Sequence, residues 1–359
     1  MILLLIFRRA RYGTKQSGKL RLKNHAIMIP AETYEENGFV PMAGPNLMLR
    51  PADLDSIPTT AEAIFGRRAP LVVEIGCGNG SFMVDLATAD TDVLVIGAEI
   101  ASPSATRAYK RISRGQLNNV RLFRGNGLFL LRDVLQPDSV SSIYINFPDP
   151  WPRTKHAGRR LFAGPFLEVA ASRLTAGAPV FLTTDHADYF AFARQQADSC
   201  GWFDVAVGPP PPPTVTTRWA QKWLEMERPI FHLRLTQKHR PPNPIPTIDA
   251  IAMQHAHMEG DLQAITTFER AVKKTPSGSI VLLNAYRTIN EDSLVFAVLV
   301  DEGDLRQEIL IEARSKGQLV IVGARRFGSP LGTRGVAEAV RFATEWLGQR
   351  GLRLRDAWY

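Results

Sequence analysis

Between Pro70 and Arg240, short runs of β-branched and apolar residues alternate with longer segments of helical periodicity. The runs read LVVEIG, VLVIGAE, NVRLF, SIYINF and APVFLTT. This order predicts an α/β fold, with a parallel Rossmann-like sheet and helices on both of its faces. We expect the helices roughly at Gly80–Ala89, Ser102–Gln116, Gly127–Val134, Pro165–Leu174 and Ala187–Ser199. Two further strands, Gly201–Val207 and Pro229–Leu235, would close the sheet as an antiparallel pair.

Proline runs divide the chain. PPPPP at 209–213 predicts a stiff connector, and PPNPIP at 241–246 predicts a linker between domains. We therefore expect a basic tail at 1–30, the α/β domain at 31–240, the linker at 241–246 and a small accessory α+β domain at 247–359. In the last of these we expect a helix around Ile248–Lys274, several strands and a helix at Gly335–Gln349. No chemical motif is recognisable there, so its role stays open.

The distribution of charge favours an anionic partner. The chain has a net charge of +8, whereas residues 247–359 hold 14 Lys/Arg against 14 Asp/Glu, so the excess lies in the first two thirds. Seven cations between residues 8 and 23 belong either to a disordered tail or to an arm that contacts a phosphate backbone. No run of residues is apolar enough to predict a membrane span.

Cysteine and histidine usage argues against structural disulfides and metal. Cys77 and Cys200 are the two cysteines; they cannot build a disulfide framework and fit a reducing cytoplasm. His255 and His257 fall in the expected helix, where residues two apart point to different faces, so we expect surface side chains rather than metal ligands.

The segment VVEIGCGNGSF opens the first strand–helix unit. Its strand ends near Glu74, and Gly76, Gly78 and Gly80 follow. Glycines at such a turn let a ligand approach the backbone closely, although a tight turn alone would explain them too. A carboxylate here would repel a dinucleotide pyrophosphate but attract the ammonium and sulfonium groups of S-adenosylmethionine, which we therefore expect as the cofactor.

Two polar residues follow the next two strands. Glu99 ends VLVIGAE, where a carboxylate can accept hydrogen bonds from both ribose hydroxyls. Asn126 lies in FRGNG, where its amide either faces an adenine edge or belongs to a simple N-G turn. Together with the glycine turn they predict the layout of a class I methyltransferase that depends on S-adenosylmethionine.

The segment INFPDPWPRTKHAGRR follows the fourth strand, at the sheet edge where open α/β folds bind ligands. Prolines on both sides of Asp149 fix φ angles and would hold this acid toward the cofactor, and Trp151 offers a stacking face. The alternative without a functional role is a proline-rich turn whose tryptophan packs against the fold. Arg159 and Arg160 are candidates for contacts to a phosphate backbone, although a solvated basic surface would also explain these cations.

FPDPWPRTKHAGRRL resembles the signature loop of the tRNA (guanine-N7-)-methyltransferases. The segments VEIGCGNGSF, IGAEIASPS, NVRLFRGNG, FLTTDHADY and TRWAQKWLEMERPIFHL are similar to other blocks of that family, in the same order, and the resemblance covers about Ala31 to Arg240. It implies methyl transfer from S-adenosylmethionine to N7 of guanosine 46 in the variable loop of tRNA, by a cytoplasmic monomer or homodimer.

The resemblance also implies roles for individual residues. Cofactor contacts fall on Glu74, Glu99 and Asn126, and Asp149 becomes the key residue at the methyl-transfer site. Contacts to the guanine fall on Arg153, Asp185, Thr217, Arg218, Trp219 and Ala220. A carboxylate beside the base, Asp149 or Asp185, would stabilise the charged product. No metal is implied.

The chain departs from the family at three positions. Asn126 replaces the usual Asp, Ala220 stands where a glutamate is expected, and Trp223 stands where glycine is common. Residues 247–359 extend beyond the usual end of the family. Two alternatives stay open: a degenerate tRNA-binding protein without activity, which Ala220 favours, and a methyltransferase acting on an exocyclic amine of RNA, whose N-P-P-Y loop is loosely similar to NFPDPW.

Overall fold

The computed structural model describes residues 46–153, 158, 160–243, 245, 247–248, 251–252, 254–327 and 330–359. The basic tail expected at 1–30, the start of the domain expected at 31–240, and Arg159 lie outside these described residues. Within the described residues, no helix is both long enough and apolar enough to cross a membrane.

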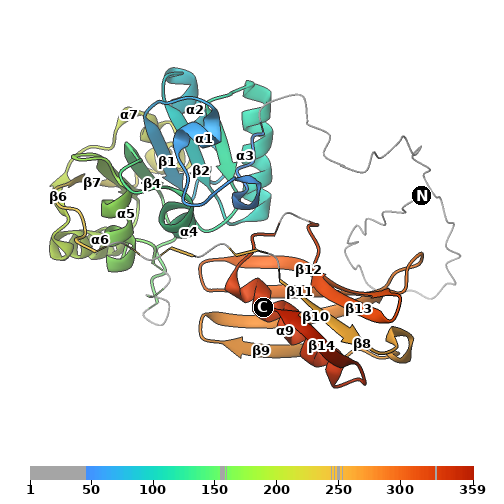
Figure 1. The fold of residues 1–359 in the computed structure, drawn as a ribbon. Coiled ribbons are helices and arrows are strands. Elements are labelled where there is room, and N and C mark those ends of the chain that lie inside the picture. Colours follow the sequence, from blue (N-terminus) through green and yellow to red (C-terminus); the bar gives the residue numbers. More distant parts are fainter. Residues whose placement is uncertain are drawn as a thin grey trace, which may run out of the picture. The chain divides into compact units, whose positions relative to one another are not determined.

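The first sheet has the strand order β3-β2-β1-β4-β5-β7-β6 (Figure 1). Its strands are β1 (Leu71–Ile75), β2 (Leu94–Ala98), β3 (Val120–Phe123), β4 (Ser142–Asn146), β5 (Pro179–Thr184), β6 (Phe203–Val207) and β7 (Phe231–Gln237). The first five strands are parallel, and β7 is antiparallel to both β5 and β6. The Rossmann-like sheet with a closing antiparallel pair, predicted from the alternating pattern, is confirmed.

Helices cover both faces of this sheet, as predicted. Helices α2 (Ser81–Ala89) and α3 (Ser102–Gly115) pack on one face, against side chains such as Val72 and Val95. Alternate strand residues such as Val73 and Ile96 point to the other face. The elements there are α4 (Gly127–Phe129), which continues into the π-helical turn η2 (Leu130–Val134), α5 (Gly164–Arg173) and α6 (Ala187–Cys200).

Short helices complete the first domain. A 3-10 turn η1 (Pro51–Asp53) and α1 (Ala61–Phe65) precede the sheet, and α7 (Pro212–Val215) and α8 (Arg218–Glu225) connect β6 to β7. The proline run at 209–213 is only partly the connector that we expected, because its last residues already begin α7. Proline is well tolerated in the first turn of a helix, where the N–H groups have no helical acceptor.

The order of the parallel strands fixes where a ligand can bind. The chain crosses from β1 to β2 and β3 on one side, and then returns to place β4 on the other side of β1. The connections at the carboxyl ends of β1 and β4 therefore diverge and leave a crevice between them.

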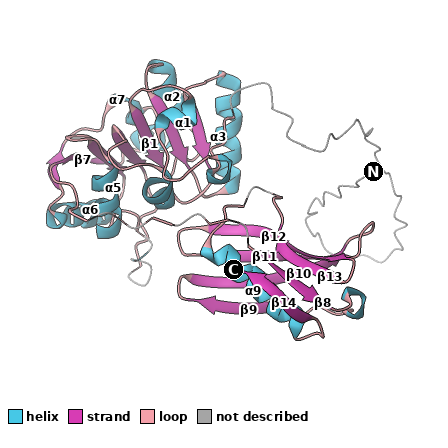
Figure 2. Cartoon of the chain, in the orientation of Figure 1, coloured by secondary structure: helices cyan, strands magenta, loops and turns pink. Residues whose placement is uncertain are grey.

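The C-terminal domain is a second, fully antiparallel sheet with the order β14-β8-β13-β12-β11-β10-β9 (Figure 2). Its elements are β8 (His255–Glu259), the 3-10 turn η4 (Leu262–Ala264), β9 (Ala271–Thr275), β10 (Gly278–Arg287), β11 (Ser293–Asp301), β12 (Arg306–Lys316), β13 (Leu319–Ala324), α9 (Arg334–Gly348) and β14 (Arg353–Trp358). Helix α9 buries its apolar side against one face of this sheet, where Trp346 meets Phe296 edge to face at 5.3 Å between ring centroids. The prediction of a small C-terminal α+β domain is confirmed.

One expected element of this domain is wrong. The helix expected around Ile248–Lys274 is replaced by β8, η4 and β9. Strand β8 lies between β13 and β14, where Ala256 and Met258 face the core, so tertiary pairing overrides the local sequence preference.

The strand also changes the interpretation of the two histidines. His255 and His257 share one face of β8, with ring centroids 5.5 Å apart, and His255 stacks on Trp358 at 4.6 Å. Across the described residues, no group of three or more His, Cys, Asp or Glu side chains could hold a metal ion.

Arg173, at the end of α5, is a buried cation that holds the turn η2 in place. Its Nε and Nη2 atoms donate to the carbonyls of Leu131 and Arg132, and Nη1 donates to Ser172 Oγ at 2.7 Å. We predict that Arg173→Leu lowers the free energy of unfolding by about 2–4 kcal/mol, because it leaves buried carbonyls without donors. Urea denaturation measures this change, and an Arg173→Leu protein as stable as the wild type would contradict it.

Candidate functional site

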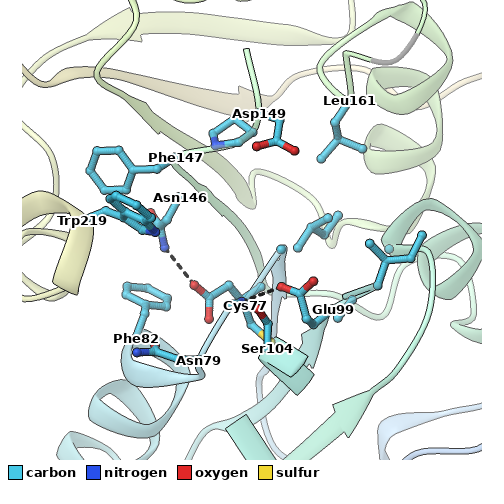
Figure 3. Close-up of a pocket in the computed structure, with 18 of the residues that line it drawn as sticks. Cys77, Asn79, Phe82, Glu99, Ser104, Asn146, Phe147, Asp149, Leu161 and Trp219 are labelled. Atoms are coloured by element: carbon cyan, nitrogen blue, oxygen red, sulfur yellow. Dashed lines mark hydrogen bonds between the residues drawn. The ribbon is translucent and has the colours of Figure 1, made fainter. Parts of the chain in front are cut away.

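A pocket with a volume of about 570 Å³ opens at the carboxyl ends of β1, β2 and β4, where the strand order predicts the crevice (Figure 3). Of the residues predicted as site residues, its lining includes Glu74, Gly76, Gly78, Glu99, Asn126, Asp149, Thr217 and Trp219. Sequence segments separated by well over one hundred residues therefore meet around one cavity.

The glycine turn leaves room on the pocket side. Gly76 and Gly78 have φ angles of 75° and 57°, and a Cβ added at either would meet nothing within 4 Å. The Gly76 amide donates to the carbonyl of Ala98 at 2.8 Å, which ties the turn to the end of β2. Gly80 has a different role: a Cβ there would lie 2.9 Å from Ala108 Cβ, so this glycine allows α2 to pack on α3.

Glu99 is held by the backbone around it. Its two carboxylate oxygens accept from the amides of Gly78, at 2.9 Å, and Ala101, at 2.7 Å. The side chain is nearly buried and lines the pocket. A carboxylate has about four acceptor positions, so this fixed group can still accept from a pair of ligand hydroxyls.

Glu74 and Asn146 form a polar pair in the pocket lining. Asn146 Nδ2 donates to Glu74 Oε1 at 3.2 Å, the dashed line that ends at Asn146 in Figure 3. Glu74 Oε2 and Asn146 Oδ1 are buried and have no hydrogen-bond partner among the described residues. Burial raises the pKa of Glu74 to about 8, an effect that the hydrogen bond from Asn146 only partly offsets. Two unpartnered acceptors at a pocket wall suit a cationic ligand group with several N–H donors.

Asn146 was missed as a site residue when the sequence was interpreted. It is the last residue of β4, in the strand beside β1, and the expected site emphasised the loop that follows. A usable signal existed, because a polar side chain that ends a buried parallel strand at the switch point of the sheet faces the ligand crevice.

The loop after β4 is anchored by more than its prolines. The Phe147 amide donates to the carbonyl of Thr183 at 2.8 Å, and Arg160 donates to the carbonyls of Pro150 and Trp151, at 3.2 Å each. The Arg160 guanidinium also lies over the Phe192 ring, 4.7 Å from its centroid. Phe147 and Trp151 adopt positive φ angles of 53° and 40°, which non-glycine residues keep only where the surroundings enforce them.

Asp149 lies at the rim of the pocket, on this anchored loop. Its side chain is exposed to solvent and lines the cavity (Figure 3). The carboxylate is therefore accessible both to a ligand inside the pocket and to one that approaches from outside.

Helix α8 contributes Trp219 to the pocket wall and carries further aromatic and cationic side chains beside it. Thr217 caps the helix by accepting from the Ala220 amide at 3.2 Å, and its position in the pocket lining places Trp219 beside the cavity. Trp219 is 51% exposed and stacks on Trp223, with ring centroids 5.7 Å apart. Lys222 Nζ lies 4.9 Å from the centroids of both rings.

Asn126 lines the pocket at the start of α4. Its Oδ1 accepts from the Leu128 amide at 2.8 Å, which makes it the N-cap of that helix. The amide is therefore oriented by the backbone before any ligand binds.

The other predicted site residues do not line this cavity. They are Gly80, Arg153, Asp185, Ala220 and Arg160, whereas the side chain of Arg218 lies outside what the structure describes. Asp185 follows β5 and lies 4.0 Å from the guanidinium of Arg228, Ala220 is buried, and Arg153 is exposed. Their roles in binding a substrate stay predictions.

Comparison with known proteins gives a consistent result. Residues 68–233 match a family model described as a putative methyltransferase. A tRNA (guanine-N(7)-)-methyltransferase of Thermus thermophilus is 37% identical over 308 residues, which cover 86% of this chain and 98% of the relative. One of the same name from Deinococcus radiodurans is 35% identical over 300 residues, covering 81% of this chain and 92% of the relative.

A solved 16S rRNA (adenine(1408)-N(1))-methyltransferase from Catenulisporales acidiphilia aligns with 56% of this chain and 99% of its own, at 17% identity and a TM-score of 0.38. The Thermus alignment spans more residues than the 240 that precede the linker, so it extends into the C-terminal domain. With 86% and 81% of its length aligned to these two relatives at 37% and 35% identity, the chain belongs to the tRNA (guanine-N(7)-)-methyltransferase family.

Proposed function

We propose that this chain transfers the methyl group of S-adenosylmethionine to N7 of a guanosine in tRNA, at position 46 of the variable loop. The observation that carries the proposal is the pair of buried acceptors on Glu74 and Asn146, unpartnered among the described residues, in a pocket that would hold the methyl donor. The names of the two relatives above state methyl transfer to guanine N7 in tRNA, without the position.

The residues of the pocket fit the cofactor. Glu74 Oε2 and Asn146 Oδ1 would accept from the ammonium of the methionyl group, and Glu99 would accept from the ribose hydroxyls. The open space beside Gly76 and Gly78 allows the ligand to lie against the backbone. Bound S-adenosylmethionine supplies an electrophilic methyl group on a positively charged sulfur.

The reaction requires that the protein align the two reactants, and it does not require a strong base. Guanine N7 carries a lone pair and no proton, so no proton has to be removed before it attacks. Holding two reactants in the attacking geometry contributes about 7–11 kcal/mol to such a step. Trp219, exposed at the pocket wall, offers a stacking face for the base, and Asp149 faces it from the anchored loop.

Asp149 also acts on charge. The purine becomes positively charged as the methyl group is transferred, and a fixed carboxylate beside it stabilises that charge. Asp149 at the pocket rim is placed for this better than Asp185, which lies outside the lining and near Arg228.

Exposed cations would hold the tRNA backbone. Arg153 follows the loop and is exposed, which suits a contact to phosphate. Arg160 is already engaged with the loop carbonyls, so its first role is to position the loop, and a phosphate contact would be additional. Arg159, proposed for the same purpose, lies outside the described residues.

A second candidate is a tRNA-binding protein without activity. Ala220 favours it, since a buried methyl group stands where the family has a glutamate. Methyl transfer to an exocyclic amine is the third possibility. One experiment separates all three functions.

The test is to incubate the purified full chain with unmodified tRNA and S-adenosylmethionine labelled on the methyl group. We expect label in the tRNA and chain cleavage by borohydride and aniline at one guanosine, because N7-methylguanosine is sensitive to this treatment. Label without cleavage would indicate an exocyclic amine, and tRNA binding without label would indicate the inactive protein.

We predict that Asp149→Ala lowers kcat by roughly 10²–10³, as the loss of one preorganised electrostatic group typically does. Asp149→Asn keeps the shape of the side chain and removes its charge. If the charge is what matters, its kcat should be as low as that of Asp149→Ala. The affinity for S-adenosylmethionine should change little in either. Near-normal turnover in both variants would rule out the role of Asp149.

The raised pKa of Glu74 predicts a proton linked to cofactor binding. In the folded protein this carboxyl titrates at about 8, against 4.5 ordinarily, so the fold binds more protons than the unfolded chain between these values. Stability should therefore fall as pH rises through this window. The cofactor's ammonium favours the ionised carboxylate, so its binding at pH 7 should release up to about one proton.

Calorimetry of cofactor binding in buffers of different ionisation enthalpy measures this proton. In Glu74→Gln we expect the release to vanish, the affinity to fall about tenfold or more, and the free protein to lose part of its pH dependence between pH 5 and 8. Equal proton release by wild type and variant would assign the proton to another group.

A further inference from the structure

Asn126 makes a contact that the proposed function does not use. Residues 46–359 form one compact unit, and within it Asn126 Nδ2 lies 3.4 Å from Oδ1 of Asp304, a residue of the C-terminal domain. Asn126 lines the cofactor pocket and Asp304 lies in the turn between β11 and β12. The C-terminal domain therefore contributes a carboxylate that contacts a residue of the cofactor pocket.

The turn that carries Asp304 is held firmly by its own domain. Gly303 adopts a φ of 78°, and its amide donates to Asp301 Oδ1 at 3.1 Å. The neighbouring Glu302 accepts from Thr333 Oγ1 at 2.5 Å and from the Gly335 amide at 2.8 Å, both at the start of α9. Asp304 is thus presented by a turn that is tied to the main helix of the domain.

Arg132 extends the contact into a small charged network. Its Nη1 donates to Asp304 Oδ2 at 2.7 Å, and its Nε and Nη2 donate to Asp133 Oδ2 at 3.0 and 2.8 Å. Asp133 is 0% exposed and accepts from the amide of Ile248, after the linker, at 2.6 Å. Ile248 and Leu305 also pack against the core of the first domain. Residues beyond the linker therefore hold both ends of the segment 126–134.

The charges around Asp304 explain why an amide is suited to position 126. Asp304 receives one donor from Arg132 and one from Asn126. A carboxylate at position 126 would remove a donor and place two negative groups beside each other. Arg132, the cation that binds Asp304, is already shared with Asp133. Asn126, a departure from the family, thus matches Asp304 in this chain.

We propose that Asp304 is a positioning residue of the cofactor site, which orients Asn126 and makes cofactor affinity depend on the C-terminal domain. The proposal rests on the proposed function, in which S-adenosylmethionine occupies this pocket. Asp304 acts through Asn126 and does not touch the cofactor itself.

A charge-exchange experiment on the full chain tests it. Asn126→Asp should weaken S-adenosylmethionine binding about tenfold, a change of about 1.4 kcal/mol, because two carboxylates then face each other. Adding Asp304→Asn should restore the affinity to within about threefold of wild type, because an amide again faces a carboxylate. Asp304→Asn alone should have a small effect, and Glu259→Gln, at an exposed ion pair with Arg353, should have none.

The split between KM and kcat separates positioning from a general loss of stability. The KM for S-adenosylmethionine should follow the dissociation constant across the variants, while kcat and the KM for tRNA stay near wild type. The unfolding midpoint of the cofactor-free variants measures the same pair without any ligand, and it too should fall in Asn126→Asp and recover in the double variant.

Each result decides something. An Asn126→Asp protein with wild-type affinity, or a double variant as weak as Asn126→Asp, overturns the positioning role while leaving the proposed function intact. A wild-type chain that does not bind S-adenosylmethionine refutes the proposed function, and the positioning role with it.

Discussion

The hydrogen bond from Asn146 to Glu74 joins the carboxyl ends of β4 and β1, the two strands where the order of the sheet reverses. It is a weak compensation for the burial of a carboxyl group, because one amide donor serves one of its two oxygens. The second oxygen and the Asn146 carbonyl are left for a ligand. The sheet creates the crevice, and the two acceptors left over from this incomplete pairing suit a cationic group with several N–H donors.

The sequence predicts this sheet well because its signals are local and periodic. Alternating strands and helices determine the layers, and the glycine turn after Glu74 is recognisable because each glycine meets a separate backbone or packing demand. The prediction of a helix where β8 lies was wrong for the opposite reason. HAHME is short and polar enough to suit several structures, and only its position between β13 and β14 makes it a strand.

The site was predictable where one residue carries the chemistry and less so where neighbours orient it. The prolines beside Asp149 predict a rigid loop. The loop also depends on the hydrogen bond from the Phe147 amide to β5. It depends as well on Arg160, which bonds to the loop and packs on Phe192. Arg160 belongs to a basic strip, so composition favours a phosphate contact for it. Its hydrogen bonds to two loop carbonyls show that a cation in such a strip also serves the geometry of an acid.

The contact of Asn126 with Asp304 has no signal in either local sequence, because it depends on how two domains meet within one compact unit. A substitution of Asn for Asp at position 126, taken alone, is simply the loss of a charged acceptor. Beside Asp304 and Arg132, Asn126 provides a hydrogen-bond donor to Asp304, whereas an aspartate at this position would repel that carboxylate. The negative charge is then supplied by Asp304 of the C-terminal domain. If Asn126 contacts the cofactor as we propose, the appended sheet acts on the cofactor site through Asp304, and the side chain at position 126 has to be considered together with both domains.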